Sequence, residues 1–455
     1  MNAFSRRGAC PALSAPMQTG DGLLVRLNPV AGGLDPKSLI GLGESALRHG
    51  NGIMEVTARG SLQIRGLTAE SARLLANEVD ALGIAVRTGV PVETGPLAGI
   101  DPEEIADPRP LAERIRTAIE KAGLTARLGP KVSVVVDGGG QLTMDAVTAD
   151  VRLKAVWAGD DVLWSLSVAC DGRSARPLAT VDADASRDIA VAALRMVAER
   201  GREVHTRDLS ERQLNSLARW HSVTPPSVLP DISPARTEGG VKKRQPKTHP
   251  IGTFALTDSH ALGIALPYGS MPAQNLIDLA TQASNLGATE IRLAPGRALL
   301  FLGLSAPSSL KASAAALGFV TDPADPRTRI AACPGTPACA SGRIATRAIA
   351  ETIAKEGADL LDTSLTLHVS GCAKGCAHPG TAALTLVGDE NGAGLVVDGT
   401  AKALPAAYRP GYDAARGVAG ILAAIRDGRH QGETAAACLA RLGAAGIAEL
   451  YRRNQ

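Results

Sequence analysis

GDGLLVRLNP at residues 20–29 opens a pattern that returns at residues 260–269 as HALGIALPYG. Each stretch is followed by a helical periodicity, in SLIGLGESALRHG (38–50) and NLIDLATQASNLG (275–287). Each then reaches an alternating run that closes with Gly-Leu, GIMEVTARGSLQIRGL (52–67) and ATEIRLAPGRALLFLGL (288–304). A period of two is typical of strands and a period near 3.6 of helices, so each copy is predicted to form strand, helix, strand. Two copies predict a duplicated α+β fold with pseudo-two-fold symmetry, with chance similarity of apolar patterns as the alternative.

The duplication continues more weakly downstream, where KVSVVVDGGG (131–140) matches SLTLHVSGCA (364–373). In this match Gly138-Gly139 stands where the second copy has Gly371-Cys372, so only the second copy carries cysteines there. Residues 223–252 contain six prolines, a Gly-Gly pair and a basic run, a composition typical of a linker. We therefore predict half-domains at 15–75 and 253–310, each followed by an α/β domain, at 76–222 and 311–455.

The composition describes an ordinary globular protein of 455 residues with a net charge of +3 and only 2% aromatic residues. Such a balance gives no reason to expect a nucleic-acid or membrane surface. No run approaches the roughly 18 apolar residues of a membrane span, and the N-terminus lacks the apolar segment of a secretory signal. We expect a cytoplasmic protein whose seven cysteines are reduced unless they bind metal.

Four of the cysteines lie in two loops, CPGTPAC at 333–339 and CAKGC at 372–376, with 32 residues between them. Four thiolates from two loops can occupy the corners of a [4Fe–4S] cube, and the surrounding Gly and Pro let the backbone turn around a bulky group. Zinc fits the wide first spacing poorly and disulfides conflict with a reducing compartment, but these and unliganded thiols remain alternatives. The predicted cluster ligands are Cys333, Cys339, Cys372 and Cys376.

Two further expectations concern the surroundings of these loops. Ser341 is predicted to cap a helix that ends at Gly357 and turns its positive end toward the cluster. The remaining cysteines, Cys10, Cys170 and Cys438, stand alone in the sequence and are expected to be buried or incidental thiols.

The cysteine order resembles that of the siroheme-containing [4Fe–4S] sulfite and nitrite reductases, in which the last pair also follows a strand. The string VTARGSLQIRGL (56–67) is similar to the T-x-R-x-x-x-Q strand of that family. The resemblance covers most of the chain and implies two ferredoxin-like half-domains plus two α/β domains. It also implies that Arg26, Arg59 and Lys131, which is expected to open a strand, line a cavity for tetrapyrrole carboxylates. Arg65 is expected to join them, because strand residues six apart share a face and guanidinium groups bind carboxylates bidentately.

The chain departs from the reductase pattern at two places. Ser133 stands where those enzymes have a second lysine, and the loop Ala373-Lys374-Gly375 lacks their usual asparagine. The strings CPALSAPMQTGDGLLVRL (10–27) and GCAKGCAHPG (371–380) are more similar to the branch of the superfamily that acts in aerobic cobalamin biosynthesis. That similarity implies oxygen-dependent hydroxylation of the tetrapyrrole precorrin-3A with γ-lactone formation. It further implies a [4Fe–4S] cluster, a mononuclear non-haem iron and an external reductant, with siroheme less expected.

Two other functions stay open: a siroheme-dependent sulfite or nitrite reductase, in which Cys376 would bridge cluster and haem iron, and a non-catalytic iron–sulfur electron-transfer protein. The sequence has no convincing nicotinamide or flavin motif, so electrons that start from NADH are expected to arrive through a separate reductase. His49, His368 and His378 are the histidines considered as iron ligands, although a lone histidine is more often structural.

Overall fold

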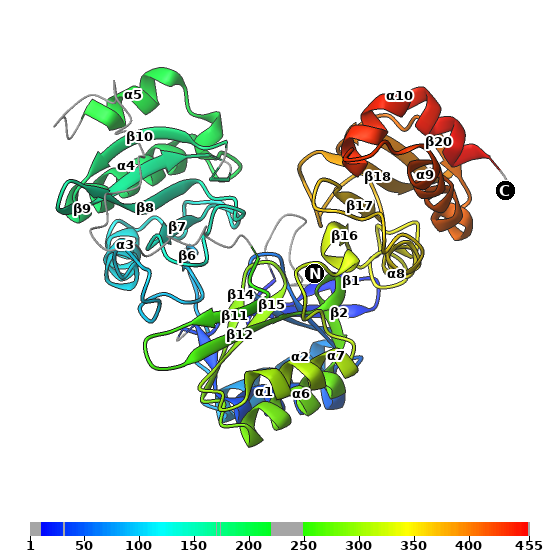
Figure 1. The fold of residues 1–455 in the computed structure, drawn as a ribbon. Helices are drawn as coiled ribbons and strands as arrows, with labels where there is room; N and C mark the ends of the chain where they lie inside the picture. The colour runs from blue at the N-terminus through cyan, green and yellow to red at the C-terminus, as the bar shows by residue number, and fades with distance from the viewer. Residues whose placement is uncertain (1–10, 31, 170, 173, 220–248, 454–455) are drawn as a thin grey trace.

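The computed structural model describes residues 11–453 apart from 31, 170, 173 and 220–248. Cys10, Cys170 and residues 223–248 of the expected linker therefore lie outside the described residues. In that described part the strands form four five-stranded sheets, arranged as two copies of a pair (Figure 1). The duplicated α+β fold predicted from the sequence is confirmed.

The first sheet has the order β1-β2-β5-β4-β13 and the second the order β11-β12-β15-β14-β3. The two orders are equivalent, and the last strand of each sheet comes from the other half of the chain. Strand β13 pairs with β4 of the first half, and strand β3 pairs with β14 of the second half. The strands are β1 Met17–Thr19, β2 Gly22–Leu27, β3 Gly33–Leu34, β4 Ile53–Val56, β5 Leu62–Leu67, β11 Gly252–Ala255, β12 His260–Ala265, β13 Ser270–Pro272, β14 Glu290–Ala294 and β15 Ala298–Leu302.

Helices cover one face of these two sheets and close a single core shared by both halves. Figure 1 shows them side by side below the strands. Leu42 and Ile64 from the first copy and Leu276 and Phe301 from the second are buried in the same cluster, so neither half-domain has a core of its own. The helices are α1 Pro36–His49, α2 Ala69–Ala81, α6 Ala273–Asn285 and α7 Pro307–Ala316.

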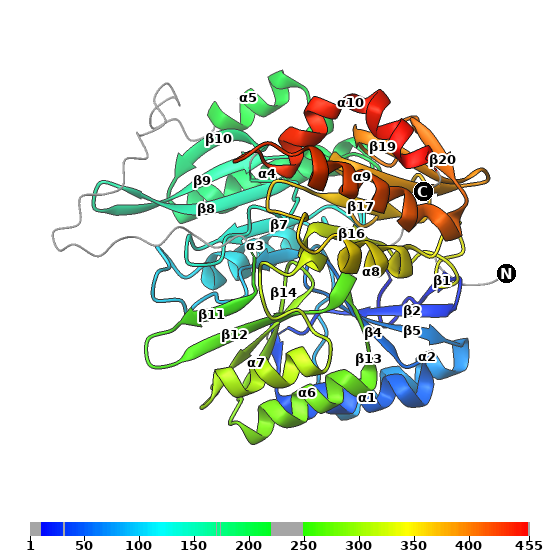
Figure 2. The same ribbon diagram turned by 45° about the vertical axis from the view of Figure 1, so that its right-hand side comes forward.

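The other two sheets form two lobes on the opposite side of the paired half-domains (Figures 1 and 2). Their orders, β6-β7-β8-β9-β10 and β16-β17-β18-β19-β20, are again equivalent, with three parallel strands followed by two antiparallel ones. Their strands are β6 Val92–Thr94, β7 Val134–Asp137, β8 Val151–Ala158, β9 Asp161–Val168, β10 Arg176–Val181, β16 Ile330–Ala332, β17 Leu367–Ser370, β18 Ala382–Asp389, β19 Gly392–Gly399 and β20 Ala407–Arg409. Their helices are α3 Arg109–Lys121, α4 Ala183–Arg200, α5 Glu211–Arg219, α8 Thr346–Glu356, α9 Ala414–Gly428 and α10 Ala435–Arg452.

Each half-domain sheet contacts the lobe formed by the other half of the chain. The outer face of the second sheet is apolar, and its Leu300 is buried with Leu97 and Leu142 of the first lobe. The outer face of the first sheet is polar instead, because Glu55, Gln63 and Arg65 alternate with core residues along their strands. This polar face meets the second lobe, the one with the cysteines. The duplication has therefore kept the topology and changed the chemistry of one interface.

Candidate functional site

The two cysteine loops lie side by side at one edge of the second lobe. Cys333 follows strand β16 and Cys372 follows the neighbouring parallel strand β17, so both chains leave the sheet at the same edge. The backbone N–H of Gly371 donates to Sγ of Cys333 at 3.1 Å. Arg343 N–H in turn donates to the carbonyl of Gly371 at 2.8 Å, which joins the loops a second time.

Glycines allow this close approach. A Cβ atom on Gly371 would lie 3.2 Å from the Cα atoms of both Gly335 and Gly342, closer than side chains normally tolerate. Gly335 and Gly375 also have positive φ angles, of 65° and 61°, which L-residues with side chains rarely adopt. The sequence-based expectation that glycines let the backbone turn closely here agrees with this geometry.

The four thiols form no disulfide, and those of Cys333, Cys339 and Cys372 act electrostatically on that of Cys376. The pKa of the Cys376 thiol is raised, first by desolvation and then by the neighbouring thiols of Cys333, Cys372 and Cys339. Cys438 is different, because it is fully buried in the core around helix α10. Four neighbouring sulfur donors on a glycine-rich cradle fit an iron–sulfur cluster, in which each thiolate ligates a separate iron.

In the described ranges no group of three or more His, Cys, Asp or Glu side chains is arranged to hold one metal ion. Zinc held by the same thiolates stays the alternative to a cluster.

The three histidines considered as iron ligands do not meet at one site, although His368 and His378 contact each other. His49 Nε2 lies 2.9 Å from a carboxylate oxygen of Glu78, between helices α1 and α2. His378 Nε2 lies 2.9 Å from the carbonyl oxygen of Thr381, and its ring is edge-on to that of His368 with centroids 5.7 Å apart. His368 is fully buried with no hydrogen-bond partner for either ring nitrogen, and burial lowers its pKa to about 4, which keeps the ring neutral.

The helix after the cysteine loop begins later than predicted. Helix α8 starts at Thr346, with Ala345 rather than Ser341 at its N-cap, and ends at Glu356 before Gly357 as expected. The prediction of a Ser341 cap is wrong, because the chain first passes through turns that pack against the glycines of the loop. Ser341 Oγ instead accepts a hydrogen bond from Lys374 Nζ at 2.8 Å, which ties one cysteine loop to the other.

Arg59 lies in the turn between strands β4 and β5, not in a strand as expected. Its guanidinium donates to the carbonyl of Thr148 at 2.7 Å, to Glu93 at 3.0 Å and to Ser133 Oγ at 2.9 Å. Ser133 is buried, so the position that carries a second lysine in the reductases here accepts a hydrogen bond from an arginine. Lys131 does not open a strand either, because β7 begins at Val134 and Lys131 is an exposed turn residue before it.

Arg26 is half-buried on the polar face of the first sheet, where strand β2 pairs it with Gln63. The Gln63 amide orientation that satisfies both of its groups accepts from Arg26 Nε and Nη2 at 3.0 and 2.8 Å. In that orientation the Gln63 nitrogen donates to Glu55 at 3.1 Å. Arg26 is thus placed beside the interface with the cysteine lobe.

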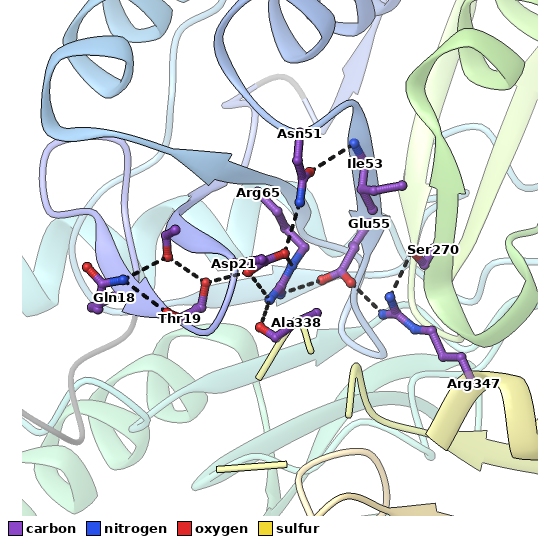
Figure 3. Close-up of polar contacts among 11 residues, drawn as sticks. Gln18, Thr19, Asp21, Asn51, Ile53, Glu55, Arg65, Ser270, Ala338 and Arg347 are labelled. Atoms are coloured by element: carbon purple, nitrogen blue, oxygen red, sulfur yellow. Dashed lines mark hydrogen bonds and ion pairs between the residues drawn. The ribbon is translucent and has the colours of Figure 1, made fainter. Parts of the chain in front are cut away.

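Arg65 is 4% exposed, and its hydrogen bonds go to protein groups (Figure 3). It makes a forked contact with Asp21, at 3.0 and 2.9 Å, and reaches Glu55 at 3.3 Å. It also donates to the carbonyl of Ala338, inside the first cysteine loop, at 2.6 Å. The structure thus gives Arg65 three protein partners, and its contact with substrate carboxylates stays a prediction.

Sequence reasoning missed the partners of these arginines. Glu55 is bonded by Arg347 of helix α8, which also donates to Ser270 Oγ at 3.0 Å (Figure 3).

In the hairpin turn of the second copy, Arg297 donates to the carbonyl of Ala377 at 3.2 Å, just after the second cysteine loop. Burial, and then the charge of Arg347, lower the pKa of Arg297. The internal duplication was the signal for Arg297, because its turn corresponds to the turn that holds Arg59.

Comparison with known proteins agrees with this architecture. The family model of the nitrite/sulfite reductase ferredoxin-like half domain matches residues 15–82. A precorrin-3B synthase from Sinorhizobium sp. is 40% identical over 454 residues, 99% of this chain and 96% of the relative. A ferredoxin–nitrite reductase from Synechococcus elongatus is 24% identical over 80% of this chain and 76% of its own length.

The structure of the Mycobacterium tuberculosis NirA protein superposes with a TM-score of 0.70 at 18% identity, covering 93% of this chain and 84% of that one. This likeness bears on the fold alone. In the described part of the chain no helix combines the length and apolar character that crossing a membrane requires.

Proposed function

The chain belongs to the precorrin-3B synthase family of the nitrite/sulfite reductase superfamily, and from this we propose that it hydroxylates precorrin-3A with molecular oxygen in cobalamin biosynthesis. The family makes it an oxidoreductase with a tetrapyrrole substrate. The observation that carries the proposal is 40% identity along essentially the whole chain. In the proposed reaction one oxygen atom enters the substrate, the other leaves as water with two electrons and two protons from an external reductant, and an acetate side chain closes the γ-lactone.

Cys333, Cys339, Cys372 and Cys376 would hold a [4Fe–4S] cluster, which supplies one-electron transfer when bound. Their free thiols and the glycine cradle support this assignment. No ligands are assigned to a mononuclear iron. The electron donor is proposed to be a separate reductase, since the sequence lacks a nicotinamide fingerprint.

Substrate binding is proposed on the side where the first half-domain meets the cysteine lobe. The substrate is a polycarboxylate, and arginines stay charged when they are removed from water. Arg26 is held by Gln63 and partly exposed, so it is the first candidate for a carboxylate contact. Arg59, which is tied to Glu93 and Ser133 of the first lobe, and Lys131, an exposed residue of that lobe, are further candidates. Both are proposed to orient the outer rim of the substrate.

The experiment is incubation of anaerobically purified protein with precorrin-3A, a reductase with NADH, and oxygen, followed by mass spectrometry. A product heavier by one oxygen atom, labelled from ¹⁸O₂, is expected. Unchanged substrate, with iron and sulfide present in the protein, would rule out the hydroxylase proposal.

A siroheme-dependent reductase is the second candidate, favoured by the 24% identity with the nitrite reductase. Siroheme gives strong Soret and visible absorption bands that a bare cluster lacks. The spectrum of the purified protein therefore separates the two functions before any activity is measured.

A further inference from the structure

We propose that Arg65 is a positioning residue that clamps the first cysteine loop, so that the substrate-binding sheet of the first half holds Cys339 in place for the cluster. This inference rests on the proposed function, since it concerns the same cysteine site.

The clamp acts on one backbone atom. The carbonyl oxygen of Ala338, next to Cys339, accepts hydrogen bonds from Arg65 Nη2 at 2.6 Å and from Gly20 N–H at 3.2 Å. Both donors belong to the first half-domain, more than 270 residues earlier in the chain. The middle of the first cysteine loop is thus held by the other half of the molecule.

Arg65 is well suited to hold this atom. Its burial disfavours the charge, but hydrogen bonds with Asp21 and the charges of Glu55 and Asp21 outweigh that cost and raise its pKa. Asn51 and Thr19 each bond Asp21, at 2.9 and 2.8 Å, and so fix the carboxylate that fixes the guanidinium (Figure 3). A planar guanidinium bonded along several edges cannot rotate away from the carbonyl.

Gly20 makes the second contact of the clamp, in which its backbone packs directly against the backbone of the loop. A Cβ atom placed on it would lie 2.8 Å from the backbone nitrogen of Ala340 and 2.9 Å from the carbonyl carbon of Cys339. The hairpin turn and the loop are therefore in backbone contact, and Gly20 has no positive φ that would by itself exclude alanine. Gly20→Ala should displace the loop by steric crowding and leaves every charged side chain unchanged.

Glu55 connects the clamp to its surroundings. It bonds Arg65 on one side and Arg347 of helix α8 on the other, and helix α8 follows the same cysteine loop. Arg65 therefore holds the loop at Ala338, and Arg347 holds the helix that follows the loop. Such support lowers the ordering cost of cluster assembly, since the backbone next to Cys339 is already held before a cluster binds.

The first test uses the full chain after removal of iron, so it does not depend on cluster chemistry. Alkylation of Cys339 is followed by mass spectrometry in Arg65→Gln, Arg65→Lys and Gly20→Ala, with Cys372 as the internal reference. Loss of the clamp should speed alkylation of Cys339 at least about fivefold relative to Cys372, because local opening becomes easier. Arg48→Gln and Gly446→Ala, an exposed arginine and a glycine with open space around it, are the matched controls.

The second test uses the cluster-loaded protein. The EPR spectrum and reduction potential of the cluster should shift in Arg65→Gln and move back toward the parent values in Arg65→Lys. Unchanged alkylation of Cys339 in both Arg65 variants, with an unchanged EPR spectrum, would overturn the clamp. A parent protein that assembles no cluster but shows the alkylation effect would keep the clamp and reject the iron–sulfur assignment.

Discussion

The carboxylate of Glu55, on strand β4, accepts a hydrogen bond from Arg347, which lies 292 residues later on helix α8. Glu55 is 5% exposed and also bonds Arg65. One buried carboxylate thus pairs with guanidinium groups from both halves of the chain and joins the first half-domain to the cysteine lobe. Removing the charge of Glu55 breaks the ion pair with Arg347 and leaves Arg65 to Asp21 alone, and breaking a buried ion pair is destabilising because the remaining charge loses its counter-charge.

Glu55→Gln should therefore lower the free energy of unfolding by about 3 kcal/mol, measured by urea denaturation. The amide keeps the shape of the side chain but removes the ion pair of Arg347 with Glu55 and leaves Arg65 paired with Asp21 alone. Glu44→Gln, which removes a carboxylate that is 53% exposed, should change stability by no more than about 0.5 kcal/mol. Equal effects of the two substitutions would contradict the buried network.

Cys376→Ser should abolish or strongly perturb the iron–sulfur spectrum, because an alcohol replaces one of four thiolate ligands. Cys438→Ser is the matched control, since Cys438 is buried in the core around helix α10 and far along the chain from both loops. It should lower stability but leave iron and sulfide per chain unchanged. Equal iron content in the two variants would count against the ligand assignment.

Glu104 gives a prediction about pH. Desolvation, opposed by a hydrogen bond from Gly99 N–H and aided by Asp101, raises the pKa of Glu104 from 4.5 to about 7. Below pH 4.5 the carboxyl is protonated in both folded and unfolded chains, so its contribution to stability is fully present. As pH rises toward 7 the unfolded chain releases the proton first, and the contribution is lost.

Glu104→Gln cannot ionise and should lack this loss. The stability of the variant relative to the parent should therefore increase from pH 4.5 to about 7 and stay constant above it. Denaturant titrations at a series of pH values measure the difference, and parallel curves for the two proteins would refute the assignment.

Arg26→Lys tests the proposed substrate contact. Lysine keeps the charge but loses the fork that grips a carboxylate and the paired contact with Gln63. The KM for precorrin-3A should rise about tenfold with a smaller change in kcat, because the contact is made in the ground state as well. Arg48→Lys is the control on helix α1, and an unchanged KM in Arg26→Lys would remove Arg26 from the binding site.

The sequence predicted the duplication well because long periodic segments carry a strong signal. The match of residues 131–140 with 364–373 even placed β7 and β17 in register, since Val134–Asp137 and Leu367–Ser370 occupy equivalent positions in it. The same match assigned Gly139 to the place of Cys372. The grouping of the two cysteine loops was predicted from their four thiols, whereas the parallel pairing of β16 and β17 that precedes them was not.

The polar network could not be predicted in the same way. Arg65 was expected to face substrate because strand alternation gives the face of a residue but not what covers that face. Its partners Asp21, Glu55 and Ala338 come from three separate segments, and no local pattern connects them. The exchanged strands β3 and β13 were also missed, because two and three residues are too short to show a period.

Those exchanged strands have a consequence for how the chain is made. Strand β4 remains an open sheet edge until residues 270–272 have left the ribosome, by which time the whole first lobe has been synthesised. An open edge is a template for pairing with other chains. During translation the edge of the first sheet therefore stays exposed until the strand from the second half is synthesised. A gene divided between the two copies would yield two products that each lack one strand.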